Sequence, residues 1–421
     1  SACGHVRYST TGETSLRNVQ PLYAELNSGG FAVAHNGNIS NAMKLRRELI
    51  RRGSIFQSTS DTEVIIHLVA TSSYRTLLDK FIDALKQVEG AYSLIVMTPE
   101  GMIACRDPLG IRPLQMGRVG DATLFASETV AFDVVGAEFV RQVEPGEVIK
   151  VDFDGNVDSL HPFGNHSARP CIFEHVYLAR PDSIMDGISV YKARLRMGEK
   201  LAEKILRERP QHDIDVVIPI PDTSRTAALE LANHLGVKFR EGFVKNRYIG
   251  RTFIMPGQAA RKKSVRQKLN AIELEFRGKN VMLVDDSIVR GTTCKQIIQM
   301  AREAGAKNVY FCSAAPAVRY PNVYGIDMPS AHELIAHGRT TDEVAELIGA
   351  DWLIYQDLDD LKDAVGGGKV KIEHFDCAVF DGQYVTGDVN EQYLDRIERA
   401  RNDAAKSTVE RVSEIIGLHN N

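Results

Sequence analysis

The 421-residue sequence has an ordinary globular composition, with 43% hydrophobic and 25% charged residues, and its length allows two or three domains. Its formal net charge of -4 disfavours nonspecific nucleic-acid binding. It also has no apolar run of about eighteen residues, so we expect a cytoplasmic protein. The six cysteines are scattered, without the close pairs of a zinc site, and reduced thiols are expected.

Three short polar motifs occur in order in the first part of the chain. They are HVRYST, HNGN and SDTE, which contain Arg7, Asn36 with Gly37, and Asp61. Each has a plain structural interpretation: a surface arginine, a turn dipeptide, and a capping box from Ser60 to Glu63 that opens an apolar helix over residues 64–70. Their occurrence together favours a ligand-binding role, with which a capping box is compatible.

The remaining elements predict two different domains. Residues 90–103 favour a hairpin of apolar strands, and further strands are expected through residues 147–153. Segment 155–169 is polar and turn-rich, so we place the boundary there, between residues 1–166 and 167–421. The second part alternates strand and helix, which is typical of a parallel sheet. The expected elements are helix 191–207, strand 214–220, a helix ending at Gly236, strand 281–284, a helix ending at Gly305, strand 309–314, helix 341–348 and a final helix from about 390.

Residues 245–270 contain eight Lys or Arg and no acid, with apolar residues in the middle of the segment. A solvated loop or a nucleic-acid contact would explain the charge alone. A lid that closes over a polyanionic substrate would explain both the charge and the apolar residues, which exclude water.

A strand, a polar loop and a helix are expected between Lys279 and Gly305. Asp285 and Asp286 follow the apolar strand, and the loop continues as SIVRGTT. Gly291 lets the backbone approach a ligand, Thr292 or Thr293 can cap the helix, and the first helical N–H groups face one anion-sized space. This pattern predicts a phosphate site. The acid pair would accept hydrogen bonds from two neighbouring hydroxyls or lie near a metal that bridges phosphates.

VMLVDDSIVRGTT resembles the phosphoribosylpyrophosphate signature of the type I phosphoribosyltransferases. With VVIPIPDTS, KNRYIGRTFIMPGQ, NVYGIDMPS, ELIAHGR and HNGN, essentially the whole chain is similar to the glutamine phosphoribosylpyrophosphate amidotransferases. The resemblance implies α/β and α+β domains. The first would be the four-layer αββα sandwich of N-terminal-nucleophile hydrolases, here incomplete, and the second a type I phosphoribosyltransferase domain with a mainly parallel sheet.

The resemblance implies transfer of glutamine-derived ammonia to phosphoribosylpyrophosphate, giving 5-phosphoribosylamine, pyrophosphate and glutamate in the first step of purine synthesis. It also implies Mg²⁺, feedback inhibition by purine nucleotides, and a homotetramer or homodimer. Some relatives carry an iron–sulfur cluster on four cysteines. Cys171 matches one of those positions, but Asn322 and the segment around Cys377 do not supply the others, so no cluster is predicted.

In the first domain, the resemblance assigns Arg7 to the glutamine carboxylate, Asn36 and Gly37 to the oxyanion hole, and Asp61 to the glutamine amino group. The family nucleophile is an N-terminal cysteine, which also supplies the α-amino base. Neither Ser1 nor Cys3 matches it, so an absent N-terminal segment is expected. We therefore expect turnover with ammonium salts and none with glutamine.

In the second domain, the resemblance assigns two groups of residues. Those for phosphoribosylpyrophosphate are Asp285, Asp286, Ser287, Arg290, Gly291, Thr292 and Thr293. Those for the lid and an ammonia channel are Lys245, Tyr248, Arg251 and Ile254. Ser224, in the PDTS loop, would lie near the magnesium together with the two acids, although a plain turn with a serine cap explains that loop equally well.

Two other functions remain open. One is a sensor of phosphoribosylpyrophosphate or purine nucleotides that uses the phosphoribosyltransferase fold without catalysis, against which the basic lid and both loops argue. The other is a different glutaminase-coupled enzyme, such as a sugar aminase or an asparagine synthetase. The phosphoribosyl signature argues against this second alternative.

Overall fold

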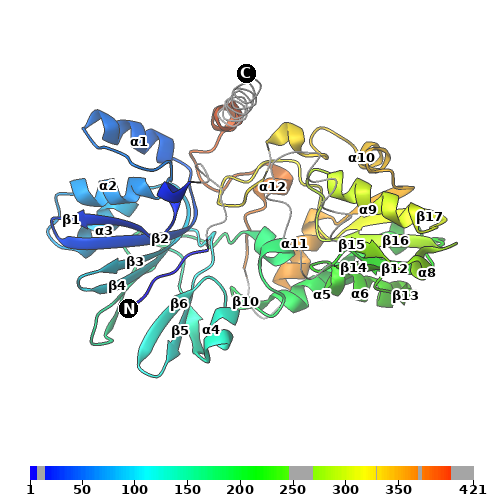
Figure 1. Ribbon diagram of the computed structural model, residues 1–421, viewed down its shortest axis with the longest axis horizontal. Helices are drawn as coiled ribbons and strands as arrows, with labels where there is room; N and C mark the ends of the chain where they lie inside the picture. Colours follow the sequence, from blue (N-terminus) through cyan, green and yellow to red (C-terminus); the bar gives the residue numbers. More distant parts are fainter. Residues whose placement is uncertain (7–14, 246–268, 329, 368–371, 400–421) are drawn as a thin grey trace, which may run out of the picture.

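The computed structural model describes residues 1–6, 15–245, 269–328, 330–367 and 372–399 (Figure 1). Two halves lie side by side, and the segments between them link an antiparallel half to a parallel one. Among the described residues, no helix is both long and apolar enough to span a bilayer.

The first half is built on a six-stranded antiparallel sheet with the order β1-β2-β3-β4-β8-β9. Its strands are β1 (Leu22–Leu26), β2 (Gly29–Ile39), β3 (Gly90–Thr98), β4 (Gly101–Arg106), β8 (Val148–Val151) and β9 (Val157–Leu160). The helices that pack on one face are α1 (Ala42–Arg51), α2 (Glu63–Thr71) and α3 (Leu77–Leu85). The β3–β4 pair is the hairpin expected from the sequence.

A second, three-stranded sheet packs on the other face. It has the order β6-β5-β7, and one short helix lies in the chain between β6 and β7. The elements are β5 (Gln115–Val119), β6 (Ala122–Ala126), α4 (Val130–Val135) and β7 (Glu138–Gln142). Met116 packs with Ala104 and Ile149 of the large sheet, whereas a Cβ on the next residue, Gly117, would lie 2.8 Å from the Phe132 ring of α4. Neighbouring residues in a strand face opposite sides, so the layers run helix, sheet, sheet, helix, as expected.

The second half contains a five-stranded parallel sheet with the order β13-β12-β16-β17-β18. Its strands are β12 (Val216–Pro219), β13 (Lys238–Phe239), β16 (Asn280–Asp285), β17 (Asn308–Ser313) and β18 (Trp352–Tyr355). Val281 and Leu283 of β16 face one core and Met282 and Val284 face another, so the sheet is covered on both sides. This confirms the predicted parallel sheet.

The helices of the second half are α5 (Val190–Glu208), α6 (Arg225–Leu235), α8 (Glu273–Phe276), α9 (Thr292–Glu303), α10 (Thr341–Ile348), α11 (Leu358–Gly366) and α12 (Ala378–Asp381). Helices α5, α6, α9 and α10 lie where the sequence predicted them, whereas α8, α11 and α12 were not predicted. Helices α5 and α6 pack on one face of the sheet, and α9 and α10 on the other. Residues 391–399 are helical, and the rest of the expected final helix lies outside the described residues.

Short elements complete the described chain. They are η1 (Leu16–Asn18), η2 (Glu174–Leu178), η3 (Ala331–Glu333), the pair β10 (Ile184–Met185) and β11 (Ile188–Ser189), and the pair β14 (Phe243–Lys245) and β15 (Leu269–Ala271). A further apolar core joins the halves, because Ala91 and Ile111 of the first half pack into a cluster with Phe173 and Tyr324 of the second.

The predicted capping box from Ser60 to Glu63 is wrong. Helix α2 begins at Glu63, and Thr62 at its N-cap makes no side-chain cap bond. The Glu63 carboxylate instead accepts the backbone N–H of Gln57, at 2.7 Å, and that of Ser58, at 2.8 Å. Glu63 therefore fixes the preceding turn, which carries Asp61 to its place beside β2.

Candidate functional site

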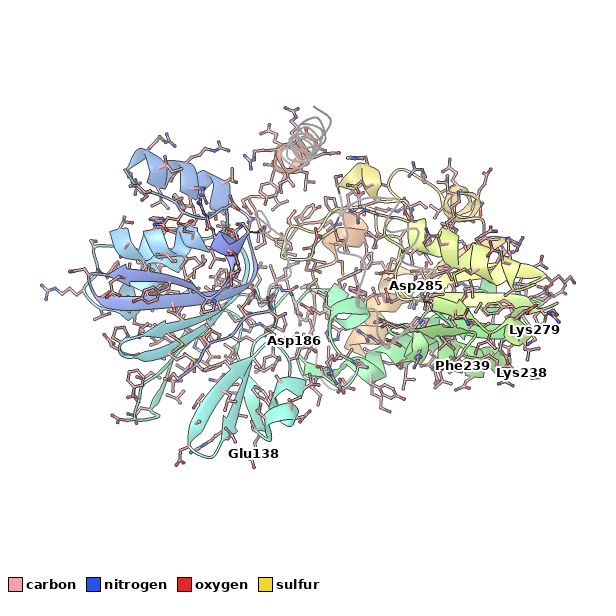
Figure 2. The ribbon with its side chains drawn as sticks, in the orientation of Figure 1. Glu138, Asp186, Lys238, Phe239, Lys279 and Asp285 are labelled. Carbon is pink, nitrogen blue, oxygen red and sulfur yellow. The ribbon has the colours of Figure 1, made fainter. Side chains whose placement is uncertain are left out.

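The acid pair lies at the carboxyl end of β16, where parallel strands place ligand sites. Figure 2 shows Asp285 at the end of the sheet that faces the first half, with Lys279 at the far edge. The Asp286 N–H donates to Asp285 Oδ1 at 2.9 Å, and the Ser287 hydroxyl donates to Asp286 Oδ1 at 2.8 Å. Both residues are partly exposed, and each carboxylate has an oxygen that can accept a further donor.

The two carboxylates are destabilised as anions. Burial raises the pKa of Asp285 well above its usual value, and the neighbouring Asp286 charge raises it further. Burial also raises the pKa of Asp286 to about 6, against hydrogen bonds from Ser287 and Thr223 and the charge of Arg194. Hydroxyl donors or a cation beside the pair would relieve this repulsion.

Gly291 shapes the loop between the acid pair and α9. It is the N-cap of the helix with φ 72°, and a Cβ there would lie 2.2 Å from Ile335 Cδ1. The expectation that Thr292 or Thr293 caps the helix is therefore wrong, because no side chain caps it and Thr292 is already helical. Both threonine side chains remain partly exposed beside the first helical N–H groups, which is the composition of an anion site.

Arg290 lies in the same loop but points to a neighbouring acid. Its Nε is 2.9 Å from Glu333 Oε2 of η3, and this pair is exposed. The arginine would have to leave Glu333, or share its guanidinium, in order to meet a phosphate.

The loop after β12 is adjacent to the acid-pair loop. The Thr223 hydroxyl bonds to Asp286, and the Ile220 N–H donates to Val284 O at 2.8 Å. Ser224 is 1% exposed and its hydroxyl donates to Ile220 O, so it faces the loop main chain. Lys245, which the resemblance assigns to a lid, has its Nζ 2.7 Å from Asp222 Oδ2 of this loop. Tyr248, Arg251 and Ile254 lie outside the described residues.

A second polar group is assembled around β2 in the first half. Asn36 and Gly37 lie in this strand, and Asp61 is 8% exposed, with its Oδ2 accepting the Ile39 N–H at 2.9 Å. Asn36, Gly37 and Asp61 are thus brought together at one end of the sheet, whereas Arg7 lies outside the described residues. His35 is buried beside Asp61, and burial lowers the pKa of its imidazole.

The second half contacts this strand directly. Asn38 Nδ2 donates to Val323 O at 2.8 Å, and Gly325 packs on the main chain of Gly37. Val323 and Gly325 of the second half therefore contact β2 of the first half.

Sequence reasoning missed three residues that support these sites. Thr223 joins the two loops, Arg194 places its charge near Asp286, and Arg112 donates to Asn36 Oδ1 at 3.0 Å. Arg112 lies in the motif RDPLGIRPL, which is evident in the sequence, but the spacing of apolar residues does not predict the partner of an arginine in a turn.

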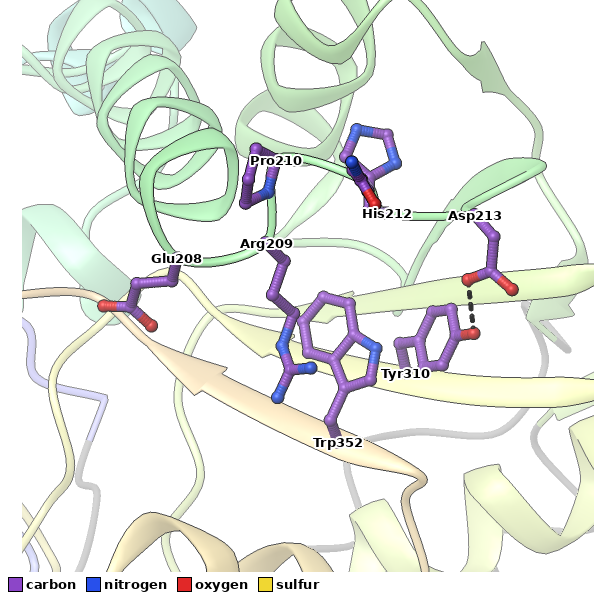
Figure 3. Close-up of a pocket in the computed structure, with 8 residues that line it drawn as sticks. Glu208, Arg209, Pro210, His212, Asp213, Tyr310 and Trp352 are labelled. Carbon is purple, nitrogen blue, oxygen red and sulfur yellow. Dashed lines mark hydrogen bonds between the residues drawn. The ribbon is translucent and has the colours of Figure 1, made fainter.

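A pocket of about 440 Å³ lies at the other end of the parallel strands, near the start of β18 (Figure 3). Trp352 stacks on Tyr310 with ring centroids 4.7 Å apart. The Arg209 guanidinium lies over the Trp352 ring, with its Cζ 4.7 Å from the ring centroid. The Tyr310 hydroxyl donates to Asp213 at 2.6 Å. These groups satisfy one another and are remote from the acid pair.

Comparisons with known proteins agree with both halves. Residues 5–134 match the model of a glutamine amidotransferase domain, and residues 188–321 match that of a phosphoribosyl transferase domain. Amidophosphoribosyltransferases from Pseudomonas aeruginosa, Escherichia coli and Saccharomyces cerevisiae are 64%, 52% and 45% identical to this chain. Each alignment covers 99% of this chain, and 86%, 86% and 85% of those relatives.

Two solved structures are similar over most of the chain. The glutamine phosphoribosylpyrophosphate amidotransferase from Bacillus subtilis, complexed with ADP and GMP, has a TM-score of 0.83 at 42% identity and covers 92% of this chain and 83% of its own. A structure described as the allosteric regulatory enzyme of purine biosynthesis has a TM-score of 0.85 at 42% identity, covering 94% and 84%. The chain therefore belongs to the amidophosphoribosyltransferases, the glutamine-dependent enzymes of the first step of purine synthesis.

Proposed function

We propose that phosphoribosylpyrophosphate binds between the acid pair and the first turn of α9, and that ammonia displaces its pyrophosphate there. The observation that carries this is the contiguity of Asp285 and Asp286 with the Gly291 turn, which places acceptors beside main-chain donors. Ribose hydroxyls would donate to the carboxylates, and the 5′-phosphate would accept from Ser287, Thr292, Thr293 and the helical N–H groups. Arg290 would contribute after leaving Glu333.

The residues around the loop after β12 suit the leaving group. Departure of pyrophosphate leaves positive charge on the ribose, so the site must stabilise an anion rather than supply a strong base. Main-chain N–H groups of the PDTS loop and the ammonium of Lys245 are the donors near this position. Lys245 would exchange its contact with Asp222 for one with the pyrophosphate.

The acid pair also fits Mg²⁺. This ion binds through one or two carboxylates and substrate phosphates while keeping several waters, and the two raised pKa values mark a place where a cation relieves repulsion. Asp285 and Asp286 would hold the ion directly or through its waters. Ser224 would contribute only if its hydroxyl turned away from Ile220 O. Bound Mg²⁺ would neutralise charge on the pyrophosphate.

The site on β2 would bind glutamine. Asn36 Nδ2 and the Gly37 N–H would face the oxyanion of the tetrahedral intermediate, and Asp61 would hold the amino group of the substrate. Arg7 would hold its carboxylate. The lid residues Tyr248, Arg251 and Ile254 would complete the ammonia path to the second site.

Purine nucleotides would compete at the phosphoribosyl site. They carry the 5′-phosphate and ribose hydroxyls that the loop and the acid pair recognise, and the similar Bacillus subtilis structure holds ADP and GMP. Inhibition should therefore weaken as phosphoribosylpyrophosphate rises. The homotetramer or homodimer implied by the family resemblance stays a prediction.

The test is a steady-state assay of pyrophosphate release with either ammonium or glutamine as nitrogen donor. Magnesium-dependent turnover with ammonium is expected, and Asp286→Asn should reduce kcat/KM for phosphoribosylpyrophosphate by about ten- to a hundredfold, because charge-assisted hydrogen bonds are worth about 1.5–3 kcal/mol. Glutamine-supported turnover would overturn the expectation of ammonia dependence. Binding of phosphoribosylpyrophosphate without turnover on either donor would favour the sensor.

A further inference from the structure

A buried arginine lies directly behind Asn36. Arg112 is 6% exposed, one of its terminal nitrogens donates to Asn36 Oδ1 at 3.0 Å, and the other lies 2.8 Å from Glu174 Oε1. Glu174 is 5% exposed, so the ion pair is shielded from water and strongly constrained. The three side chains form one contact chain, which we call the Asn36 support.

The RDPLGIRPL turn fixes where Arg112 stands. The buried Asp107 carboxylate accepts the N–H groups of Ile111, at 2.9 Å, and of Arg112, at 3.2 Å. Arg106 Nε donates to the Arg112 carbonyl at 2.7 Å, and its guanidinium is itself held by Asp186 at 2.9 Å. The main chain of Arg112 is therefore held at both its N–H and its carbonyl, and its side chain reaches Asn36 and Glu174.

Glu174 belongs to the segment that joins the two halves. It is the first residue of η2. The carbonyl of His175 in η2 and that of Ala179, the residue after it, accept hydrogen bonds from Arg194 at 2.9 and 2.8 Å. Burial raises the pKa of the Glu174 carboxyl, and the charge of Arg112 opposes that rise. Loss of Arg112 would thus leave a buried acid without its cation.

The chemistry of arginine determines which way the Asn36 amide faces. A guanidinium carries donors and no acceptor, so only the amide oxygen can meet it. The amide nitrogen is then directed to the other side, where it lies 3.3 Å from Ser127 Oγ. We propose that Arg112 and Glu174 are positioning residues that hold the Asn36 amide with its nitrogen facing the oxyanion site.

This inference rests on the oxyanion role given to Asn36 in the proposed function. It adds the residues that make that role possible, since an amide free to flip would present an acceptor to an anion for part of the time. Ser127 cannot make the choice alone, because a hydroxyl both donates and accepts.

The test observes the amide orientation directly, without needing glutamine turnover. Deuterated protein labelled with ¹⁵N at asparagine gives the side-chain NH₂ signals, and Asn36→Asp identifies that of Asn36. In the unaltered chain, nuclear Overhauser contacts should run from these protons to Ser127 and not to residue 112. Arg112→Lys, which keeps a donor without an acceptor, should preserve this pattern.

The informative variant is Arg112→Gln with Glu174→Gln, which leaves no unpaired buried charge but places an acceptor behind Asn36. Contacts to both Ser127 and Gln at position 112 are expected, because either amide orientation then finds a partner. Contacts to Ser127 alone in this double variant would overturn the proposal, and so would loss of the Ser127 contact in Arg112→Lys.

Two controls separate this inference from the proposed function. Ammonium-supported pyrophosphate release should change by less than about twofold in the double variant, because the phosphoribosyl loops are untouched. Addition of glutamine should shift the Asn36 NH₂ signals of the unaltered chain. An orientation that matches expectation without any glutamine-induced shift would refute the oxyanion role while leaving the positioning result intact.

Discussion

Gly325 of the second half packs directly against Gly37 of the first, at the strand proposed to bind the oxyanion. A Cβ on Gly325, where φ is 101°, would lie 2.7 Å from both the carbonyl carbon and the Cα of Gly37. These are main-chain atoms, so the contact cannot be relieved by turning a side chain. The position therefore accepts glycine alone.

Gly325→Ala should lower the thermal unfolding temperature and weaken glutamine binding. The positive φ alone is worth about 1–3 kcal/mol for a residue with a Cβ, and the contact with Gly37 adds to it. Gly53→Ala is the matched control, because φ is 97° there and nothing lies within 4 Å of the added Cβ. Equal losses of unfolding temperature in the two variants would show that the contact between the halves contributes nothing.

Gly291→Ala should raise KM for phosphoribosylpyrophosphate in the ammonium assay. The added methyl group would lie 2.2 Å from Ile335 Cδ1, which would push the proposed phosphate-binding loop away from Ile335. Combining it with Ile335→Val, which removes Cδ1, should recover part of the affinity. Gly338→Ala has a similar φ of 66° in open space and should leave KM unchanged; an unchanged KM in Gly291→Ala would contradict the assigned phosphate position.

The pH dependence of the reaction should follow the acid pair. In the proposed site, the ionised carboxylate of Asp286 would accept the ribose hydroxyls. Burial raises the pKa of Asp286 to about 6, so kcat/KM should rise with pH through about 6 and level off above it. At pH 5 roughly one tenth of the carboxylate is ionised. A flat profile between pH 5 and 7 would contradict this assignment.

Stability should change with pH in the opposite direction. Because the pKa of Asp286 is higher in the folded state than its model value of 3.8, the folded chain binds more protons between about pH 4 and 6. This group's contribution to the free energy of unfolding therefore falls as pH rises through that window. Asp286→Asn should flatten the fall, measured by urea unfolding at several pH values, while reducing turnover. An unchanged slope would indicate that other groups set it.

Trp352 provides a fluorescence probe of the second half, since it is the single tryptophan of the sequence. Arg209 lies 4.7 Å from its ring centroid, and such a contact is worth about 0.5–1 kcal/mol at partly exposed sites. Arg209→Ala should shift the emission to longer wavelength and lower stability by about that amount, with Arg209→Lys intermediate. Emission from both variants that matches that of the unaltered chain would contradict the contact between Arg209 and the Trp352 ring.

Several regular elements could be predicted from the sequence because their apolar spacing is local information. Residues 281–284 and 341–348 show this, since a buried strand and an amphipathic helix each require one pattern and few neighbours. The acid pair and its loop were also predicted, because strand, acids, glycine and hydroxyls are consecutive. Gly291 was recognised as a place of close approach to a ligand, but its position as the N-cap and its contact with Ile335 were not predicted.

The supporting residues could not be predicted, because their partners are distant in the chain. Arg112 meets Asn36 across 76 positions and Glu174 across the link between the halves. Glu63 forms its bonds with Gln57 and Ser58 rather than with Ser60, since the preceding turn brings those donors closer. Spacing alone does not separate these alternatives.

The apolar cluster that contains Ala91, Ile111, Phe173 and Tyr324 makes the two halves interdependent. Separating them between residues 166 and 167 would expose this surface on both pieces, so neither piece alone would have the solubility of the intact chain. The molecule should consequently melt as one cooperative unit, with Trp352 emission and the far-ultraviolet signal of the antiparallel half changing together. Exchanging one half for that of a relative would require matching this surface as well as the two sites.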